Sequence, residues 1–196
     1  MISGVILAAG SSARMSGARQ LLPFQGKPIL QHVIDAAFQA ALDEILVVIG
    51  HEEDRLRAAI ELPPKARFVL NLDHESGLST SLVTSLQAAD PTCEAAVVLM
   101  GDQPTLSPAV IRALVEAFLE TMMPIVRAEF RDGPGPALLS EGIWDNLMTL
   151  KGDTGARGFI EANPDLVETV RFDEEAPIDV DSDEAYGLLV EARGGA

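Results

Sequence analysis

The sequence predicts a three-layer α/β/α sandwich built around a mostly parallel sheet. Apolar, β-branched runs alternate along the chain with segments of helical periodicity, and the links between them are short. Several apolar runs are continuous rather than alternating, which is typical of central strands that are covered on both faces. The expected strands are Val5–Ala9, Ile45–Ile49, Phe68–Leu70, Ala95–Met100, Ile125–Arg127 and Val167–Phe172.

Seven further segments have the apolar periodicity of helices. The clearest begins after Ser107, a residue that can cap a helix, and Pro108, which suits a first turn. Its apolar residues from Val110 to Phe118 fall on one face. The Gly- and Pro-rich stretch Arg131–Pro136 predicts a hairpin or a mobile loop, and not a domain linker. The expected helices are Ile29–Ala41, Glu53–Ile60, Ser79–Ala89, Ala109–Met122, Ile143–Leu150, Ala156–Ala162 and Glu184–Ala192.

Length and composition indicate one globular domain spanning residues 1–196. With 47% hydrophobic residues the chain is too apolar to be disordered, and its formal net charge of −16 argues against nucleic acid or an anionic membrane as a partner. Cys93 is the only cysteine, so no internal disulfide can form, which fits a cytoplasmic protein. No apolar run is long enough to span a bilayer, and the first one lacks the basic segment of a signal peptide.

The N-terminal segment is the most informative part of the chain. The apolar run Val5–Ala9 ends at Gly10 in a small, polar, glycine-bearing loop that carries Arg14 and Arg19. No Asp or Glu occurs before Asp35, although the chain as a whole is strongly acidic. A strand that opens into such a loop presents backbone N–H groups to a phosphate, and basic side chains can neutralise it. The segment therefore predicts a phosphate-binding loop.

This loop is neither of the two common phosphate-binding motifs. It lacks the Gly-Lys-Ser/Thr ending of a Walker A loop and the G-x-G-x-x-G of a dinucleotide-binding turn. Its pattern, L-A-A-G-x-S-x-R-M, resembles nucleotidyltransferases that activate sugars, isoprenoid precursors and the molybdenum cofactor. The resemblance is strongest to the molybdenum cofactor cytidylyltransferases and their guanylyltransferase relatives, and it covers nearly the whole chain. It implies a Rossmann-like sheet of the nucleotidyltransferase type and a nucleotide site that includes Leu7, Ala8, Ala9, Gly10, Arg14 and Arg19.

A second motif, G-D-Q-P, follows the apolar run Ala95–Met100. Asp102 would stand at the carboxyl end of this strand, at the same edge as the phosphate loop. A carboxylate beside phosphates is repelled unless a cation lies between them, and Mg²⁺ binds a carboxylate together with phosphate oxygens. In the resembling family this segment supplies the metal ligand, so Asp102 is a candidate catalytic and metal-binding residue. The alternative is a turn aspartate that caps the following helix.

A third motif near the C-terminus, Asp179-Val180-Asp181-Ser182, resembles the D-x-D-T-P-E-D segment of the family. Asp179 would complete the magnesium site; it is preferred over Asp181 because a register shift turns a side chain to the opposite face. The alternative is an acidic start to the last helix, for which Ser182 and the following acids are suited.

Two other segments resemble substrate-binding parts of the family. The pattern N-x(5)-G-x-S-x-S-L resembles its base-reading segment, in which Asn71, Gly77, Ser79 and Ser81 would meet the nucleotide; alternatively it is an ordinary loop leading into a helix. The pattern G-D-T-G-A-R resembles the border of the family's acceptor pocket. The second substrate would then meet Gln103, Asp153 and Arg157; alternatively Asp153 caps a helix start and pairs with Arg157.

The chain departs from the family at two positions. Arg19 stands where the family has Lys before Gln-Leu-Leu-Pro, and Gly135 stands where the family has a polar side chain between Gly and Pro. Arginine has a planar guanidinium group, whereas lysine has a compact ammonium group. Since both are cations, the change from Lys to Arg19 is expected to preserve phosphate binding, but it could lower the rate of the reaction.

Together these motifs imply an enzyme that transfers CMP from CTP to the terminal phosphate of molybdopterin, with Arg14, Arg19 and Asp102 as catalytic residues and Mg²⁺ as cofactor. A molybdenum hydroxylase of the xanthine dehydrogenase type would receive the product. Two alternatives stay open. One is a nucleotidyltransferase that uses GTP, or that acts on a sugar or metabolite phosphate. The other is a non-catalytic maturation factor that binds a nucleotide or the finished cofactor.

Overall fold

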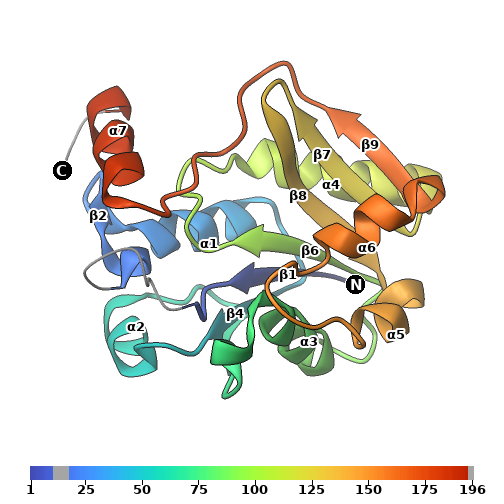
Figure 1. Ribbon diagram of the computed structural model, residues 1–196, viewed down its shortest axis with the longest axis horizontal. Helices are drawn as coiled ribbons and strands as arrows, with labels where there is room; N and C mark the ends of the chain where they lie inside the picture. Colours follow the sequence, from blue (N-terminus) through green and yellow to red (C-terminus); the bar gives the residue numbers. More distant parts are fainter. Residues whose placement is uncertain (11–17, 194–196) are drawn as a thin grey trace.

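The computed structural model describes residues 1–10 and 18–193 (Figure 1). Its centre is a sheet of seven strands in the order β5-β4-β1-β6-β8-β7-β9. Every pairing is parallel except those of β8, which runs antiparallel to β6 and β7. The prediction of a mostly parallel sheet is therefore confirmed. The strands are β1 (Ile2–Leu7), β4 (Glu44–Ile49), β5 (Ala66–Leu70), β6 (Ala95–Met100), β7 (Ile125–Phe130), β8 (Gly133–Ser140) and β9 (Val167–Arg171).

Helices cover both faces of the sheet. Side chains along β1 alternate, so that Ile6 belongs to one apolar cluster and Val5 and Leu7 to another. The first cluster also contains apolar residues of α1 (Ile29–Gln39), α2 (Glu53–Ala59) and α4 (Pro108–Thr121). The second contains those of α3 (Leu78–Ala88), α5 (Trp144–Leu147) and α6 (Arg157–Ala162). This arrangement confirms the three-layer sandwich. No helix within residues 1–10 and 18–193 is long and apolar enough to cross a bilayer.

The C-terminal helix α7 (Asp183–Arg193) lies against a small hairpin of β2 (Pro23–Phe24) and β3 (Lys27–Pro28), as Figure 1 shows. A separate apolar cluster joins them, made by Phe24, Ile29, Val180 and Leu189. The hydroxyl of Tyr186 also donates to the carbonyl oxygen of Pro23 at 2.6 Å. These contacts attach the last part of the chain to the segment that follows the N-terminal loop.

The structure differs from the expected elements in the region after β7. The sequence predicts a hairpin or a mobile loop at Arg131–Pro136 and no strand directly after it. The hairpin is present, since β7 and β8 pair antiparallel with Phe130 opposite Gly133, but β8 already begins at Gly133 and continues for eight residues. The expected helix Ile143–Leu150 is mostly a turn: a 3₁₀ turn at Glu141–Ile143 is followed by the single helical turn of α5. Three further 3₁₀ turns lie at Arg19–Leu21, His74–Ser76 and Pro164–Leu166.

Gly187 offers a test of the packing of α7. It lies inside this helix, and a Cβ added there would meet no atom within 4 Å. Because glycine lowers helix stability through its backbone entropy, Gly187→Ala is expected to raise the free energy of unfolding by about 0.5–1 kcal/mol. Urea denaturation followed by circular dichroism measures this difference. A loss of stability would show that α7 is not packed as described.

Candidate functional site

The carboxyl ends of β1 and β6 bring the first two sequence motifs together. The two strands are neighbours, with Leu7 paired to Met100, so the residues that follow them meet at one edge of the sheet. The backbone N–H of Gly101 donates to the carbonyl oxygen of Leu7 at 3.0 Å. A Cβ on Gly101 would lie 2.9 Å from that of Ala8, so only glycine allows this close approach. Gly10 and Asp102 therefore face the same space.

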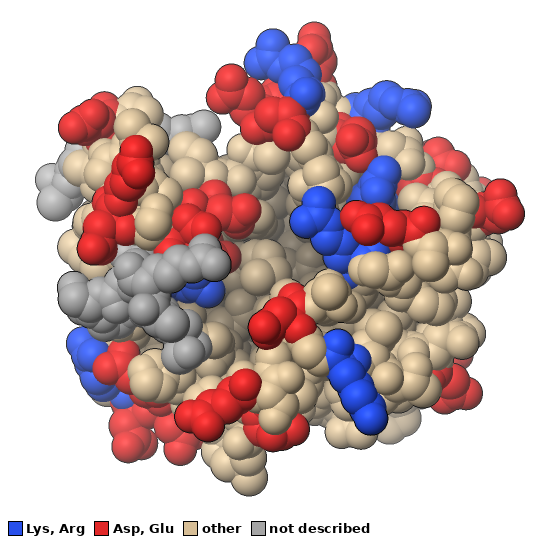
Figure 2. Space-filling model, in the orientation of Figure 1, with Lys and Arg blue, Asp and Glu red and all other residues tan. Residues whose placement is uncertain are grey.

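Two adjoining pockets open at this edge. The first, of about 430 Å³, is bounded by Gly10, Arg19 and Gly77 among others. The second, of about 590 Å³, extends over β8 towards α6 and includes Arg157. Both are lined by Asp102, which stands at their junction. Figure 2 shows the hollow in the middle of this face of the molecule.

Asp102 is a buried carboxyl group, with only 8% of its side chain exposed. Its Oδ2 atom lies 3.2 Å from Nη2 of Arg19. Its Oδ1 atom is buried and has no hydrogen-bond partner among the described residues. Burial raises the pKa of Asp102 to about 6; Arg19 opposes this rise, whereas the carboxylates of Asp179 and Asp181 add to it. Among the described residues, Asp102 is thus influenced by two further carboxylates as well as by Arg19.

The C-terminal segment is attached directly to the loop that carries Asp102. The N–H of Val180 donates to the carbonyl oxygen of Asp102 at 3.0 Å, and Val180 itself is fully buried. The side-chain amide of Gln103 donates to Oδ1 of Asp179 at 2.8 Å. Asp179 and Asp181 flank Val180, and both line the second pocket. Since residues two apart share a face of an extended segment, the alternation argument does not separate Asp179 from Asp181.

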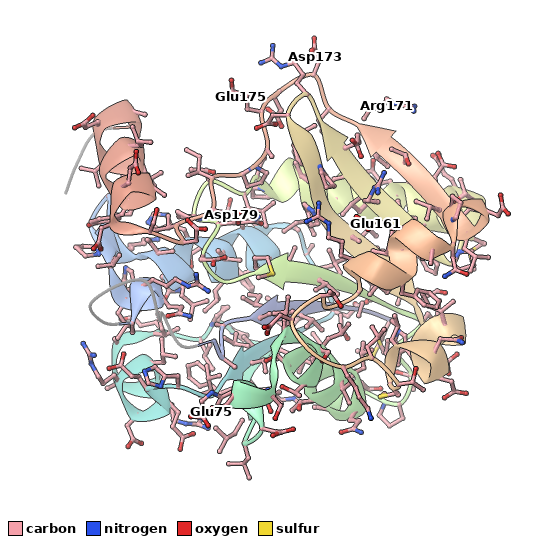
Figure 3. All side chains as sticks on the ribbon, viewed as in Figure 1. Glu75, Glu161, Arg171, Asp173, Glu175 and Asp179 are labelled. Carbon is pink, nitrogen blue, oxygen red and sulfur yellow. The ribbon has the colours of Figure 1, made fainter. Side chains whose placement is uncertain are left out.

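The donor set at this junction fits a magnesium ion. Carboxylate oxygens are the ligands that Mg²⁺ prefers, and the unpartnered Oδ1 of Asp102 is one that a cation would satisfy. Asp179 lies beside the same hollow in Figure 3. In the part of the chain that the structure describes, no group of three or more His, Cys, Asp or Glu side chains is arranged to hold a metal alone. Substrate phosphates and water would thus have to complete the ligand set, as is usual for Mg²⁺.

Most of the residues expected to bind the nucleotide border the first pocket. Ala8 does not, because it is packed in the core, and Arg14 lies outside the described residues. A residue that the sequence analysis did not select, Gln20, positions the start of the loop. Its amide donates to the carbonyl oxygens of Ala8 at 3.2 Å and Gly10 at 3.5 Å. The expected residues that line this pocket are Leu7, Ala9, Gly10, Arg19, Gly77 and Ser81.

The expected base-reading segment is divided between the pocket wall and the interior. The amide of Asn71 is buried and donates to the hydroxyls of Thr80 at 2.9 Å and Ser81 at 3.0 Å. Ser79 is fully buried, and neither Asn71 nor Ser79 lines either of these two pockets. Asn71 and Ser79 therefore support the wall of the first pocket from the protein interior. Two residues of the same segment that the sequence analysis did not select, His74 and Glu75, do line the first pocket.

Gly77 joins this segment to the expected acceptor-binding loop. Its φ angle is +111°, and a Cβ there would lie 2.5 Å from the carbonyl carbon of Gly152. The N–H of Ser79 donates to the carbonyl oxygen of Gly152 at 3.0 Å, and the N–H of Leu78 donates to Oδ1 of Asp153 at 3.3 Å. Asp153 therefore caps α3, a helix remote in sequence, and not the helix that follows it.

The three residues expected to meet the second substrate all border the second pocket: Gln103, Asp153 and Arg157. Arg157 pairs with Glu161 at 3.0 Å rather than with Asp153. Arg127 of β7 also lines the second pocket. It could not be selected from the sequence, because it belongs to an expected strand and to no recognisable motif.

The chain is similar in sequence and in structure to known proteins. Residues 4–168 match the family model described as the MobA-like NTP transferase domain. The chain is 29% identical over 198 residues to nicotine blue oxidoreductase of Paenarthrobacter nicotinovorans, covering 96% of each protein. The crystal structure of Rv0371c from Mycobacterium tuberculosis H37Rv is 30% identical, with a TM-score of 0.87 and 97% of each chain covered. The same mycobacterial protein in complex with manganese is 29% identical, with a TM-score of 0.85 and coverage of 97% of this chain and 98% of that one. The protein belongs to the MobA-like NTP transferase family and is a nucleotidyltransferase of that family.

Proposed function

We propose that this protein transfers CMP from CTP to the terminal phosphate of molybdopterin and releases pyrophosphate. The observation that carries the proposal is Asp102, a buried carboxylate with an unused oxygen at the junction of two pockets. One pocket offers Arg19 to a triphosphate, and the other has room for a phosphorylated acceptor. Membership of the MobA-like family supports nucleotidyl transfer, and the manganese complex of the mycobacterial relative supports a divalent metal.

In the proposed reaction, an oxygen of the acceptor phosphate attacks the α-phosphorus of CTP. A new P–O bond forms there as the bond from the α-phosphorus to the oxygen bridging to the β-phosphate breaks, and its electron pair leaves with pyrophosphate. The nucleophile is already anionic, so no strong general base is required. Catalysis then depends mainly on alignment of the two phosphates and on neutralisation of their charge.

The residues at the junction are suited to these two tasks. Asp102 and Asp179 would hold Mg²⁺, which when bound neutralises the charge of the triphosphate and of the leaving pyrophosphate. Gln103 fixes the orientation of Asp179 through their hydrogen bond of 2.8 Å. Arg19 would hold the triphosphate from the other side, with Arg14 of the preceding loop as a second cation. The backbone at Ala9 and Gly10 would lie against the phosphates.

The proposed choice of CTP depends on Ser81, which lines the first pocket. The hydroxyl of Ser81 accepts a hydrogen bond from Asn71, so its own hydrogen is available to an acceptor atom of the base. Cytosine offers such atoms on its ring edge, and a polar group left unpaired would penalise a poorly matched base. We expect a higher kcat/KM for CTP than for GTP, and a smaller difference between them in Ser81→Ala.

Pyrophosphate release from each of the four NTPs, with and without molybdopterin, tests the proposal. CTP with acceptor is expected to give the highest rate. A higher rate with GTP, or with a sugar phosphate as acceptor, would replace the proposed substrates, and binding without turnover would indicate a maturation factor. Because one relative is named an oxidoreductase, oxidation of NADH by the same preparation is measured in parallel, and activity there without pyrophosphate release would contradict nucleotidyl transfer.

Arg19 is expected to contribute to nucleotide affinity through its charge. Arg19→Ala removes a charge-assisted contact to phosphate and should weaken CTP binding about tenfold or more, whereas Arg19→Lys keeps the charge and should retain most of the affinity. Calorimetric titration measures both. Arg112→Ala is the control, since Arg112 is on α4 and bonds the carbonyl oxygen of Gln39 outside the pockets. Unchanged CTP affinity in Arg19→Ala would contradict the assignment.

A further inference from the structure

The second pocket has two arginines on the side away from β6, each paired with a glutamate. Its wall there includes Arg127 of β7 and Arg157 at the start of α6. The register of the sheet places Val98 of β6, Ala137 of β8 and Arg127 side by side across three strands. Because neighbouring strands are about 4.8 Å apart, Arg127 lies about 10 Å across the sheet from the strand that leads to Asp102.

Arg127 occupies a place where a sheet usually carries an apolar residue. Alternation along β7 puts it on the same face as the buried Ile125. The side chain is 28% exposed, and its Nη2 atom lies 3.0 Å from Oε2 of Glu129. Its Nε atom is buried and has no hydrogen-bond partner among the described residues. A half-buried guanidinium with an unused N–H donor is suited to donate to a ligand oxygen, because such a donor is costly to leave unpaired.

Arg157 adds a second cation to this wall. Its Nε atom lies 3.0 Å from Oε1 of Glu161, one helical turn further on, and both side chains are largely exposed. Exposed ion pairs of this kind are weak, so a ligand anion can displace Glu161 from Arg157 at little cost. Figure 2 shows basic and acidic side chains meeting on one wall of the hollow, and Figure 3 places Glu161 and Asp179 on its opposite sides.

The two ends of the pocket thus carry different groups. The junction end has the carboxylates of Asp102, Asp179 and Asp181. The β7 and α6 side has the two arginines. We propose that the acceptor carries a second anionic group, remote from its reacting phosphate, and that Arg127 binds this group with help from Arg157. The inference rests on the proposed function, since it defines the class of acceptor.

Two small molecules of similar length test this proposal. Phosphogluconate has a phosphate at one end and a carboxylate at the other, whereas sorbitol phosphate has only the phosphate. In calorimetric titrations with Mg²⁺ present, the wild-type protein is expected to bind phosphogluconate about tenfold more tightly. Arg127→Ala should abolish this difference. Arg127→Lys keeps the positive charge but loses the planar guanidinium group, so it should reduce the difference in affinity between the two probes without removing it.

Arg131→Ala is the matched control, because Arg131 is an exposed arginine just after β7 that lies 4.0 Å from Asp173 and does not line the second pocket. It should leave the difference between the probes unchanged. Equal affinity of the wild-type protein for the two probes, including no binding of either, would overturn the proposal, as would a difference that persists in Arg127→Ala. CTP binding and pyrophosphate release are measured separately, so failure of nucleotidyl transfer and failure of this anion site give different results.

Discussion

Asp102→Asn is expected to lower turnover by about 100-fold or more and, at the same time, to stabilise the metal-free protein at neutral and alkaline pH. The substitution keeps the shape of the side chain but removes the charge that Mg²⁺ requires. The stability gain follows from the pKa of Asp102, which burial raises from its ordinary value of 3.8 to about 6. A raised carboxyl pKa means that ionisation works against folding, so stability is lost as the pH rises through about 6.

The expected gain at pH 8 is about 1–3 kcal/mol, and it should vanish near pH 4, where the wild-type carboxyl is protonated as well. Urea denaturation at both pH values with a chelator present measures it. Added Mg²⁺ should stabilise the wild-type protein and not the variant. Near-normal turnover in Asp102→Asn at saturating Mg²⁺ would disprove the metal-ligand role, and lower stability at pH 8 would disprove the account of the buried charge.

The second large effect is expected at Gly77. Its φ of +111° and ψ of 172° fall in a region that is essentially restricted to glycine. A Cβ there would also lie 2.5 Å from the carbonyl carbon and 2.6 Å from the carbonyl oxygen of Gly152, which are backbone atoms that cannot turn aside. Gly77→Ala is therefore expected to cost about 3 kcal/mol or more of stability and to weaken CTP binding, because the start of α3 must separate from the loop at Asp153.

Gly142→Ala is the control for this substitution. The nearest atom to a Cβ at Gly142 is the hydroxyl oxygen of Ser140 at 4.0 Å, so the change in stability should stay within about 0.5 kcal/mol. Thermal denaturation of both variants and CTP titration of those that fold give the comparison. If Gly77→Ala were as stable as Gly142→Ala, the junction between α3 and the loop at Gly152 would not have the tight packing described.

The fold could be predicted from the sequence where local patterns and tertiary packing agree. The continuous apolar runs of β1, β4 and β6 are buried on both faces, and the cap of α4 is as expected, with the N–H of Ala109 donating to Ser107 Oγ at 3.2 Å. The strand β8 was missed because Gly133-Pro134-Gly135-Pro136 has the composition of a turn. In the structure a Cβ on Gly135 would lie 2.3 Å from the ring of Phe130, so the glycine accommodates a core aromatic side chain rather than a bend.

In the functional site, too, some residues could be predicted from the sequence and others could not. Motifs that follow strands were sufficient to predict Gly10, Arg19 and Asp102 at one edge, because parallel topology brings strand ends together. The ion pair between Arg19 and Asp102, and the contact of Asp153 with the start of α3, join residues more than 70 positions apart, and no local pattern encodes such contacts. The place of Arg127 depends on the register of β7 with β8. The position of Arg127 cannot be predicted from the sequence unless β8 is recognised as a strand.

The most direct test of the central claim is where a metal ion and a nucleotide bind relative to Asp102. Crystals grown with Mn²⁺ and CTP, measured near the manganese absorption edge, locate the metal by its anomalous signal. We expect a manganese ion between the carboxylates of Asp102 and Asp179 and the triphosphate, with the cytosine in the first pocket beside Gly77 and Ser81. A manganese ion bound away from Asp102, or CTP bound outside this pocket, would contradict it.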